Sequence, residues 1–136
     1  MASSCTCEPK FLQRLGREVI VLEFAWTAHT DGSFDSVSTD DFDFGTRTLT
    51  QIIKGKRIIG AKTIPGSVTA PTADYDVSVV DSDSNDVFTG LLYDRSATAT
   101  QYISTSGFVF IESALAVDIL NNSVNSATGT VKLIFV

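Results

Sequence analysis

The stretch DYDVSVVDSDSNDVFTGLL, residues 74–92, decides the fold of this 136-residue chain. Apolar and polar side chains nearly alternate from Tyr75 to Val80, which is the period-two pattern of a strand with one buried face. The six residues that follow, 81–86, are all polar and are rich in Asp, Ser and Asn, which favour turns. A second apolar run begins at Val87. The stretch therefore predicts a β-hairpin.

Short apolar runs separated by turn signals continue through most of the chain. From Arg17 the sequence changes, and residues 19–26 form an almost unbroken run of apolar residues, many of them β-branched; Asp31-Gly32 is a strong hairpin signal shortly after it. Residues 130–136 form a closing strand with apolar residues on one face. Turn signals about every 8 to 12 residues are typical of an all-β, antiparallel β-sandwich, with a small partly open barrel as the alternative. We expect one sandwich domain over residues 17–136.

The segments between these runs carry weaker signals. We expect a weak strand at 34–38 and an exposed acidic connection at 40–45, and we expect 46–50 to begin another strand. The apolar pairs Ile52-Ile53 and Ile58-Ile59 flank a basic turn, which predicts a second hairpin or a bulged strand. Small residues at 97–103 predict an edge strand, and 104–107 a further turn.

Residues 1–16 differ from the rest of the chain and are interpreted as an extended N-terminal arm. Phe11, Leu12 and Leu15 have the spacing of one or two amphipathic helical turns, which Gly16 would end. So short a helix is marginal alone and must pack on something. The alternative is a partly ordered terminus.

Composition limits the classes of partner. The formal net charge of −6 argues against binding nucleic acid, because the phosphate backbone needs clustered Lys and Arg. No run of about 18 apolar residues could span a bilayer, and the first 16 residues lack the apolar core of a signal peptide. We therefore expect no membrane partner and a soluble product made in a cytoplasm.

Two ligand-binding motifs are incomplete. Residues 55–63 resemble a phosphate-binding loop, but the spacing of Gly60 to Lys62 is wrong by one residue, and Pro65-Gly66 prevents the helix that should follow. Asp81, Asp83 and Asn85 match positions 1, 3 and 5 of a calcium loop. The glycine and glutamate that complete such a loop are replaced by Asp86 and Leu92, so an Asx-rich turn is the better interpretation.

Metal and catalytic chemistry have few candidate residues. Cys5 and Cys7 are too few for a structural zinc site, and His29 is the only histidine, so unpaired reduced thiols are expected. His29 lies beside the predicted Asp31-Gly32 turn, and the chain has no Gly-x-Ser-x-Gly elbow to present a nucleophile. We expect a protein that is not an enzyme and that holds no cofactor or metal.

Several short segments of the second half of the chain form a recognisable set: Pro71-Thr72, Asp74-Tyr75-Asp76-Val77, the acidic turn, Asp86-Val87, Gly90-Leu91, Arg95-Ser96-Ala97-Thr98, Asn122-Ser123 and Thr128-Gly129-Thr130-Val131. Through these segments the second half, mainly residues 64–136, resembles small structural proteins of tailed bacteriophage virions and prophages. The sequence differs from this family at Asn85-Asp86, where a glycine is expected, and at Cys5-Thr6-Cys7, which is not typical of it.

The resemblance implies a structural protein located in the virion, made in the host bacterial cytoplasm, with capsid or other virion proteins as partners. We expect a capsid cement or decoration protein, with a neck, tail or baseplate component as the first alternative. A homo-oligomer of threefold or higher symmetry suits both. A carbohydrate- or ligand-binding β-sandwich, with Trp26, Tyr93 and Tyr102 as its aromatic platform, is the alternative from another class. The residues expected at the interface are apolar: Phe11, Leu12, Leu15, Trp26, Phe42 and Phe44. For Trp26, Phe42 and Phe44, packing in the core is an equal alternative.

Overall fold

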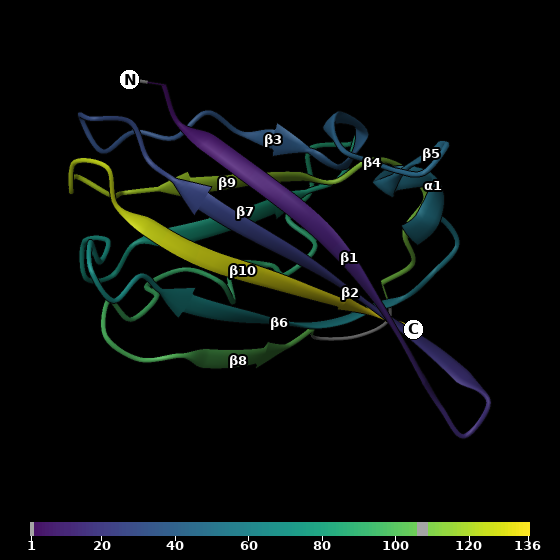
Figure 1. Cartoon of the computed structure of the whole chain (residues 1–136). Helices are drawn as coiled ribbons and strands as arrows, with labels where there is room; N and C mark the ends of the chain where they lie inside the picture. Colours follow the sequence, from purple (N-terminus) through teal and green to yellow (C-terminus); the bar gives the residue numbers. More distant parts are fainter. Residues whose placement is uncertain (1, 106–108) are drawn as a thin grey trace.

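The computed structural model describes residues 2–105 and 109–136 and consists of two antiparallel β-sheets packed face to face (Figure 1). The larger sheet has the order β1 (Ser4–Arg14), β2 (Arg17–Thr27), β10 (Thr128–Phe135), β6 (Ile58–Pro65) and β8 (Gln101–Ser104). The smaller sheet has the order β3 (Val37–Ser38), β9 (Ala116–Leu120) and β7 (Asp76–Val80). The sheets do not close into a barrel, so the predicted β-sandwich is confirmed and the barrel alternative is wrong.

The core lies between the inner faces of the two sheets. Along β2 and β10 every second side chain is buried, because successive residues of a strand point to opposite faces. The larger sheet contributes Ile20, Leu22, Phe24, Val131, Leu133 and Phe135. The smaller sheet contributes Val77, Val79, Val117 and Ile119.

Trp26 belongs to this core, so its prediction as an interface residue is wrong. Its side chain is only 2% exposed and contacts the rings of Phe34 and Tyr75, with centroids 6.1 and 5.9 Å away. Gly129 lies opposite Trp26 on β10, and a Cβ atom there would come within 2.7 Å of the indole. Trp26 is buried because every second residue of a strand points to the same side, and Trp26 shares the inner side of β2 with Leu22 and Phe24.

The stretch from residue 74 to 92 forms only the first half of the expected hairpin. β7 is a strand, and the turn after it is confirmed, since Asp81 Oδ1 accepts the backbone N–H groups of Asp83 and Asn85 at 3.0 Å. The return segment forms successive turns in place of a strand, and β7 pairs with β9 instead. Asp86 explains the difference, because its carboxylate accepts the N–H groups of residues 88 and 90 and so favours a folded backbone.

The hairpin predicted around Ile52-Ile53 and Ile58-Ile59 is also wrong. The short strands β4 (Asp43–Phe44) and β5 (Arg47–Thr48) pair with each other, and a helix, α1 (Leu49–Ile53), follows directly. Thr48 and Gln51 form a capping box at its start, which satisfies backbone N–H groups that a strand would have offered to a neighbour. A 3-10 helix, η1 (Thr39–Asp41), occupies the start of the acidic connection.

The remaining segments mostly match their predictions. The weak strand expected at 34–38 is present as the two-residue β3, and β8 is an edge strand as expected. The turn expected at 104–107 lies partly outside the described residues.

Residues 4–14 form an edge strand, so the helical turns predicted there are wrong. β1 pairs with β2 along its whole length, from Ser4 opposite Thr27 to Arg14 opposite Arg17. Leu15 and Gly16 make the turn with φ values of 52° and 75°, the positive values that a tight two-residue hairpin requires. Because β1 is part of the larger sheet, residue 16 marks a turn within one structure and not the end of a separate arm.

The contact of Trp26 with Gly129 predicts that Gly129→Ala destabilises the protein by about 1–3 kcal/mol, because the added methyl group overpacks the core. The free energy of unfolding in urea measures this. Asn125→Ala, at an exposed position in the turn before β10, is the control and should change stability by no more than about 0.5 kcal/mol. Equal effects of both variants would contradict the packing described here.

Candidate functional site

The β1–β2 hairpin extends beyond the rest of the larger sheet. The pairing of β10 with β2 reaches only as far as Ile20, which lies opposite Phe135. Residues 12–14 and 17–19 therefore pair only with each other, and the turn at 15–16 lies at the far end. Figure 1 shows this part of the hairpin projecting away from both sheets, below the C-terminus. We call residues 11–20 the hairpin tip.

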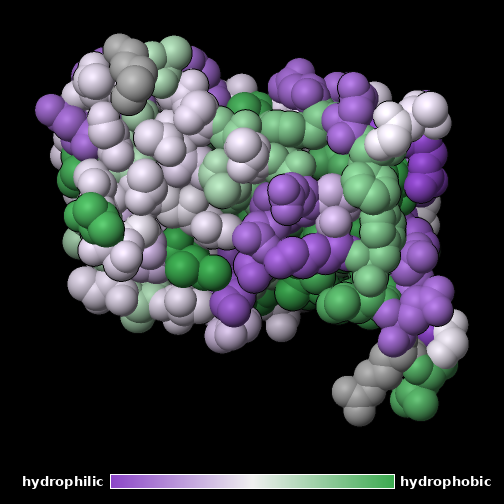
Figure 2. All heavy atoms as spheres, viewed as in Figure 1, coloured by the Kyte–Doolittle hydropathy of each residue, from purple (hydrophilic) through white to green (hydrophobic). Residues whose placement is uncertain are grey.

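Large apolar side chains are exposed on and beside the hairpin tip. Phe11 is 40% exposed, Leu12 54% and Leu15 93%. Phe44, which is 48% exposed, lies against Phe11 with the ring centroids 5.5 Å apart. Figure 2 shows green, apolar atoms at the end of this projection. The structure thus places four of the six predicted interface residues, Phe11, Leu12, Leu15 and Phe44, on or beside one projection.

Phe42 differs from these four. It is half-buried, and its ring contacts the core ring of Phe24 edge-on, with centroids 6.0 Å apart. Phe42 lies on the inner side of the larger sheet, where it covers part of the core. It is therefore less exposed to a partner than the other four residues. Phe42 and Trp26 are therefore packing residues in this structure.

Ion pairs hold the hairpin in register. The ammonium of Lys10 on β1 lies 3.0 Å from Glu23 on β2, and Lys132 on β10 approaches the same oxygen at 3.5 Å. The hydrogen bond from Lys10 lowers the pKa of Glu23, with a further contribution from the charge of Lys132. Near the tip, Glu18 pairs with Lys56 at 3.3 Å. The projection is thus tied to the sheet on both of its faces.

The two cysteines lie on the inner side of β1 and are both free thiols. Cys5 is opposite Trp26 and Cys7 is opposite Phe24, and both are partly buried against the core. Burial raises the pKa of Cys5 to about 11, and burial together with the charge of Cys5 raises the pKa of Cys7 further. Protonated thiols are poor nucleophiles and poor metal ligands.

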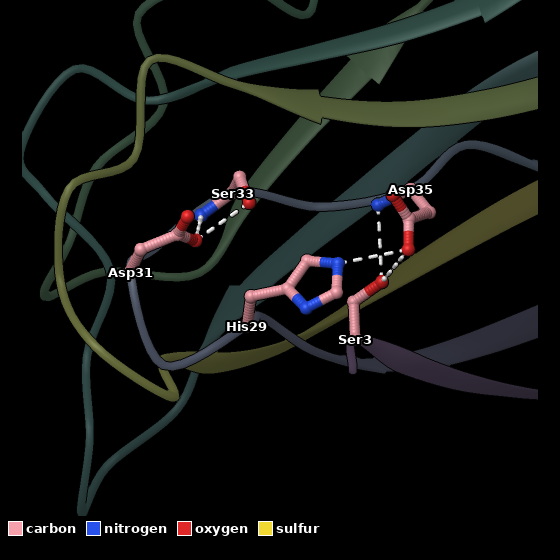
Figure 3. Close-up of polar contacts among 5 residues, drawn as sticks. All are labelled: Ser3, His29, Asp31, Ser33 and Asp35. Carbon is pink, nitrogen blue, oxygen red and sulfur yellow. Dashed lines mark hydrogen bonds and ion pairs between the residues drawn. The ribbon is translucent and has the colours of Figure 1, made fainter. Parts of the chain in front are cut away.

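His29, Asp35 and Ser3 meet beside the start of β1 in an arrangement that resembles a catalytic triad only in composition (Figure 3). Asp35 Oδ2 lies 2.8 Å from His29 Nε2 and also accepts the hydroxyl of Ser3 at 3.2 Å. In a working triad the imidazole lies between the serine and the carboxylate, so that it can take the serine proton. Here the carboxylate lies between the other two groups, so Ser3 is not activated by His29.

Asp31, which follows the same strand end, shapes the turn. Its carboxylate accepts the backbone N–H and the hydroxyl of Ser33 at 3.0 and 2.6 Å (Figure 3). These two hydrogen bonds lower the pKa of Asp31. The chain reverses here as the Asp31-Gly32 signal predicts.

The other predicted ligand motifs have structural roles. Residues 58–63 of the phosphate-loop motif lie in strand β6, and none of the described residues after this strand forms a helix. Asp81 binds its own turn, and within residues 2–105 and 109–136 no three His, Cys, Asp or Glu side chains are grouped to hold a metal ion. The aromatic platform is not formed as predicted, because Trp26 is buried while Tyr93 and Tyr102 are exposed.

Comparison with protein-family models, with curated proteins and with solved structures found no match to this chain. None of the helices in the described part of the chain is long and apolar enough to cross a membrane.

Sequence patterns missed one feature of the larger sheet, a row of charged residues across its outer face. Glu8, Glu23, Lys132 and Lys62 lie on neighbouring strands and are aligned by the register of the pairs. In each strand, the alternation of apolar and polar residues shows that the charged residue of the row points outward. The alignment itself requires the strand order, which local sequence does not contain.

The raised thiol pKa values predict that stability falls at high pH. The folded protein keeps the Cys5 proton more tightly than the unfolded chain, so this stabilisation is complete below pH 9.0 and is lost as the pH rises to about 11. Unfolding in urea between pH 8 and pH 11 measures the slope. The double variant Cys5→Ala/Cys7→Ala should show a shallower slope, and an unchanged slope would contradict the burial of the thiols.

Proposed function

We propose that the protein is a non-enzymatic structural component of a tailed-phage virion, and that it acts as a capsid cement or decoration protein. The observation that carries the binding role is the hairpin tip, where Phe11, Leu12, Leu15 and Phe44 are exposed together. The virion setting rests on the sequence resemblance of residues 64–136.

The hairpin tip has the properties of a binding element. Aromatic and large aliphatic side chains dominate the energetics of protein interfaces once they are removed from water. Leu15 stands at the end of the projection and is almost wholly in contact with water. Its burial in a pocket of a neighbouring subunit would contribute about 1.5–3 kcal/mol.

The hairpin is also ordered before it binds. β1 is paired with β2 along its whole length, Lys10 and Glu23 form an ion pair between these two strands, and Lys132 and Lys56 link β2 to the rest of the molecule through Glu23 and Glu18. A rigid element loses less conformational entropy on association than a flexible arm does. A projecting strand pair can therefore insert between two capsid subunits at a low entropic cost.

A neck, tail or baseplate station is the alternative within the virion, because a projecting hairpin would serve equally to join subunits of a ring. A ligand-binding role is supported less, since the buried Trp26 cannot contribute to an exposed aromatic platform.

Cryo-electron microscopy of particles from the producing phage distinguishes these stations. Density at the capsomer junctions, with the hairpin tip inserted between neighbouring subunits, is the expected result. Density confined to the neck or tail would favour the alternative station. Absence of the chain from the particle would overturn the virion role.

Leu15→Ser should bind purified particles that lack the protein at least about tenfold more weakly, which corresponds to about 1.4 kcal/mol. Co-sedimentation of the protein with these particles measures the loss. Val68→Ser is the matched control, because Val68 is 96% exposed but lies in a loop far along the chain from the hairpin. Unchanged binding by Leu15→Ser, or equal loss with Val68→Ser, would contradict the role of the tip.

A further inference from the structure

The outer face of the larger sheet carries a charged row across four of its five strands, and the row ends at a tyrosine on the fifth. The register aligns Glu8 on β1 with Glu23 on β2, Lys132 on β10, Lys62 on β6 and Tyr102 on β8. Figure 2 shows the row as a purple belt across the middle of this face. Lys62 lies over the ring of Tyr102, with its ammonium 5.0 Å from the centroid. Acidic and basic residues are therefore separated along the row: the acidic residues lie on β1 and β2, and the basic residues lie on β10 and β6.

Apolar side chains lie beside this row, on the side toward the hairpin tip. Val21 on β2 and Ile134 on β10 face each other in the register, and both are only half-buried. Val19 and Leu12 continue the apolar surface outward. A sheet face that is exposed to water normally carries polar residues at such positions. Lys10 lies opposite Val21 on this half of the face, where it pairs with Glu23. The apolar residues around it have the composition of a surface that another protein covers.

The other side of the row is shallow and carries small side chains. Ala25 on β2 lies opposite Thr130 on β10, and Thr6 and Thr27 lie nearby. These residues line a depression of about 400 Å³ on the outer face. Small side chains allow a second sheet to approach closely along this half of the face.

We propose that this outer face binds the same face of a second copy of the chain about a two-fold axis that runs parallel to the strands, between β2 and β10. This axis places β2 over β10 of the partner subunit and β1 over β6 of the partner subunit. Glu23 then faces Lys132 of the partner subunit, and Glu8 faces Lys62 of the partner subunit. Each contact occurs twice, as in every two-fold interface.

The apolar residues match under the same operation. Val21 faces Ile134 of the partner subunit, and Ala25 faces Thr130 of the partner subunit. The face is therefore complementary to itself in charge and in hydrophobicity, which is what favours a second copy over an unrelated partner.

Other placements of the axis are unfavourable. A two-fold axis that runs along β10 would bring Lys132 against its own copy. An axis that lies along the row, perpendicular to the strands, would bring both Glu23 and Lys132 against their own copies. Like charges in close contact across an interface cost several kcal/mol. The separation of charge along the row thus selects the axis between β2 and β10.

This contact goes beyond the proposed virion role and does not depend on it. The hairpin tip projects past the sheet, so Leu15 stays available to a different partner. A two-fold contact also differs from the threefold or higher symmetry that the family resemblance implies.

Charge exchange between two variants tests the dimer. Sedimentation velocity of the full chain should show a dimer, and Glu8→Lys and Lys62→Glu should each weaken it at least about tenfold, because each places like charges together twice. An equimolar mixture of the two variants should restore dimers, since both cross-contacts then pair opposite charges. Circular dichroism confirms that each variant folds.

Asp83→Lys and Lys54→Glu are the matched controls. They change the net charge by the same amounts at exposed positions in the turns after β7 and α1, and they should leave the dimer intact. A monomeric wild type, an equal effect of the controls, or a mixture that stays monomeric would overturn the proposal. A wild-type trimer or larger ring that Glu8→Lys leaves unchanged would overturn it as well. Particle binding is a separate assay, so either proposal can fail alone.

Discussion

The pairing of β2 with β10 is the interaction on which the rest of the structure depends. It joins residues 20–27 to residues 128–135, and it brings the buried rows of both strands together in one inner face. β1 is attached to the molecule through β2, and β6 and β8 are attached through β10. The absence of a side chain at Gly129 leaves room for the Trp26 indole beside this pairing. Contacts this distant in sequence form slowly during folding, so the sheet is completed only when the two ends of the chain meet.

The class of fold was predictable because alternation is a property of each strand by itself. The runs at 74–80 and 130–136 showed it, while the run at 19–26 was recognised by its nearly continuous apolar residues, and all three lie in strands of the sandwich. The errors arose where a local hydrogen bond competes with the extended chain. Asp86 folds the segment after the central turn, and the capping box of Thr48 and Gln51 starts a helix where apolar pairs suggested strands. At residues 4–14 helical turns were predicted where the structure has a strand. That segment is extended only because it pairs with β2.

The candidate site could be predicted only in part, because aromatic residues are equally suited to a core and to an interface. Parity separates the two uses for Trp26, which shares its side of β2 with Phe24. The side of the strand does not separate a core role from an interface role for Phe11. Phe11 shares the inner side of β1 with Cys7 and is exposed only because the sheet ends near it. The self-complementary row has the same origin: its members are visible in the sequence, but their alignment depends on a strand order that joins distant parts of the chain.

The edge position of β1 has a further consequence for the behaviour of the protein in concentrated solution. The outer edge of this 11-residue strand offers the N–H and C=O groups that do not face β2 as a template for another chain, which is how sheets extend into fibrils. Pro9 lies in the middle of this strand and has no N–H to donate, and the charged Glu8 and Lys10 flank it. These three residues interrupt the template, so the strand can project from the sheet without recruiting further chains into an aggregate.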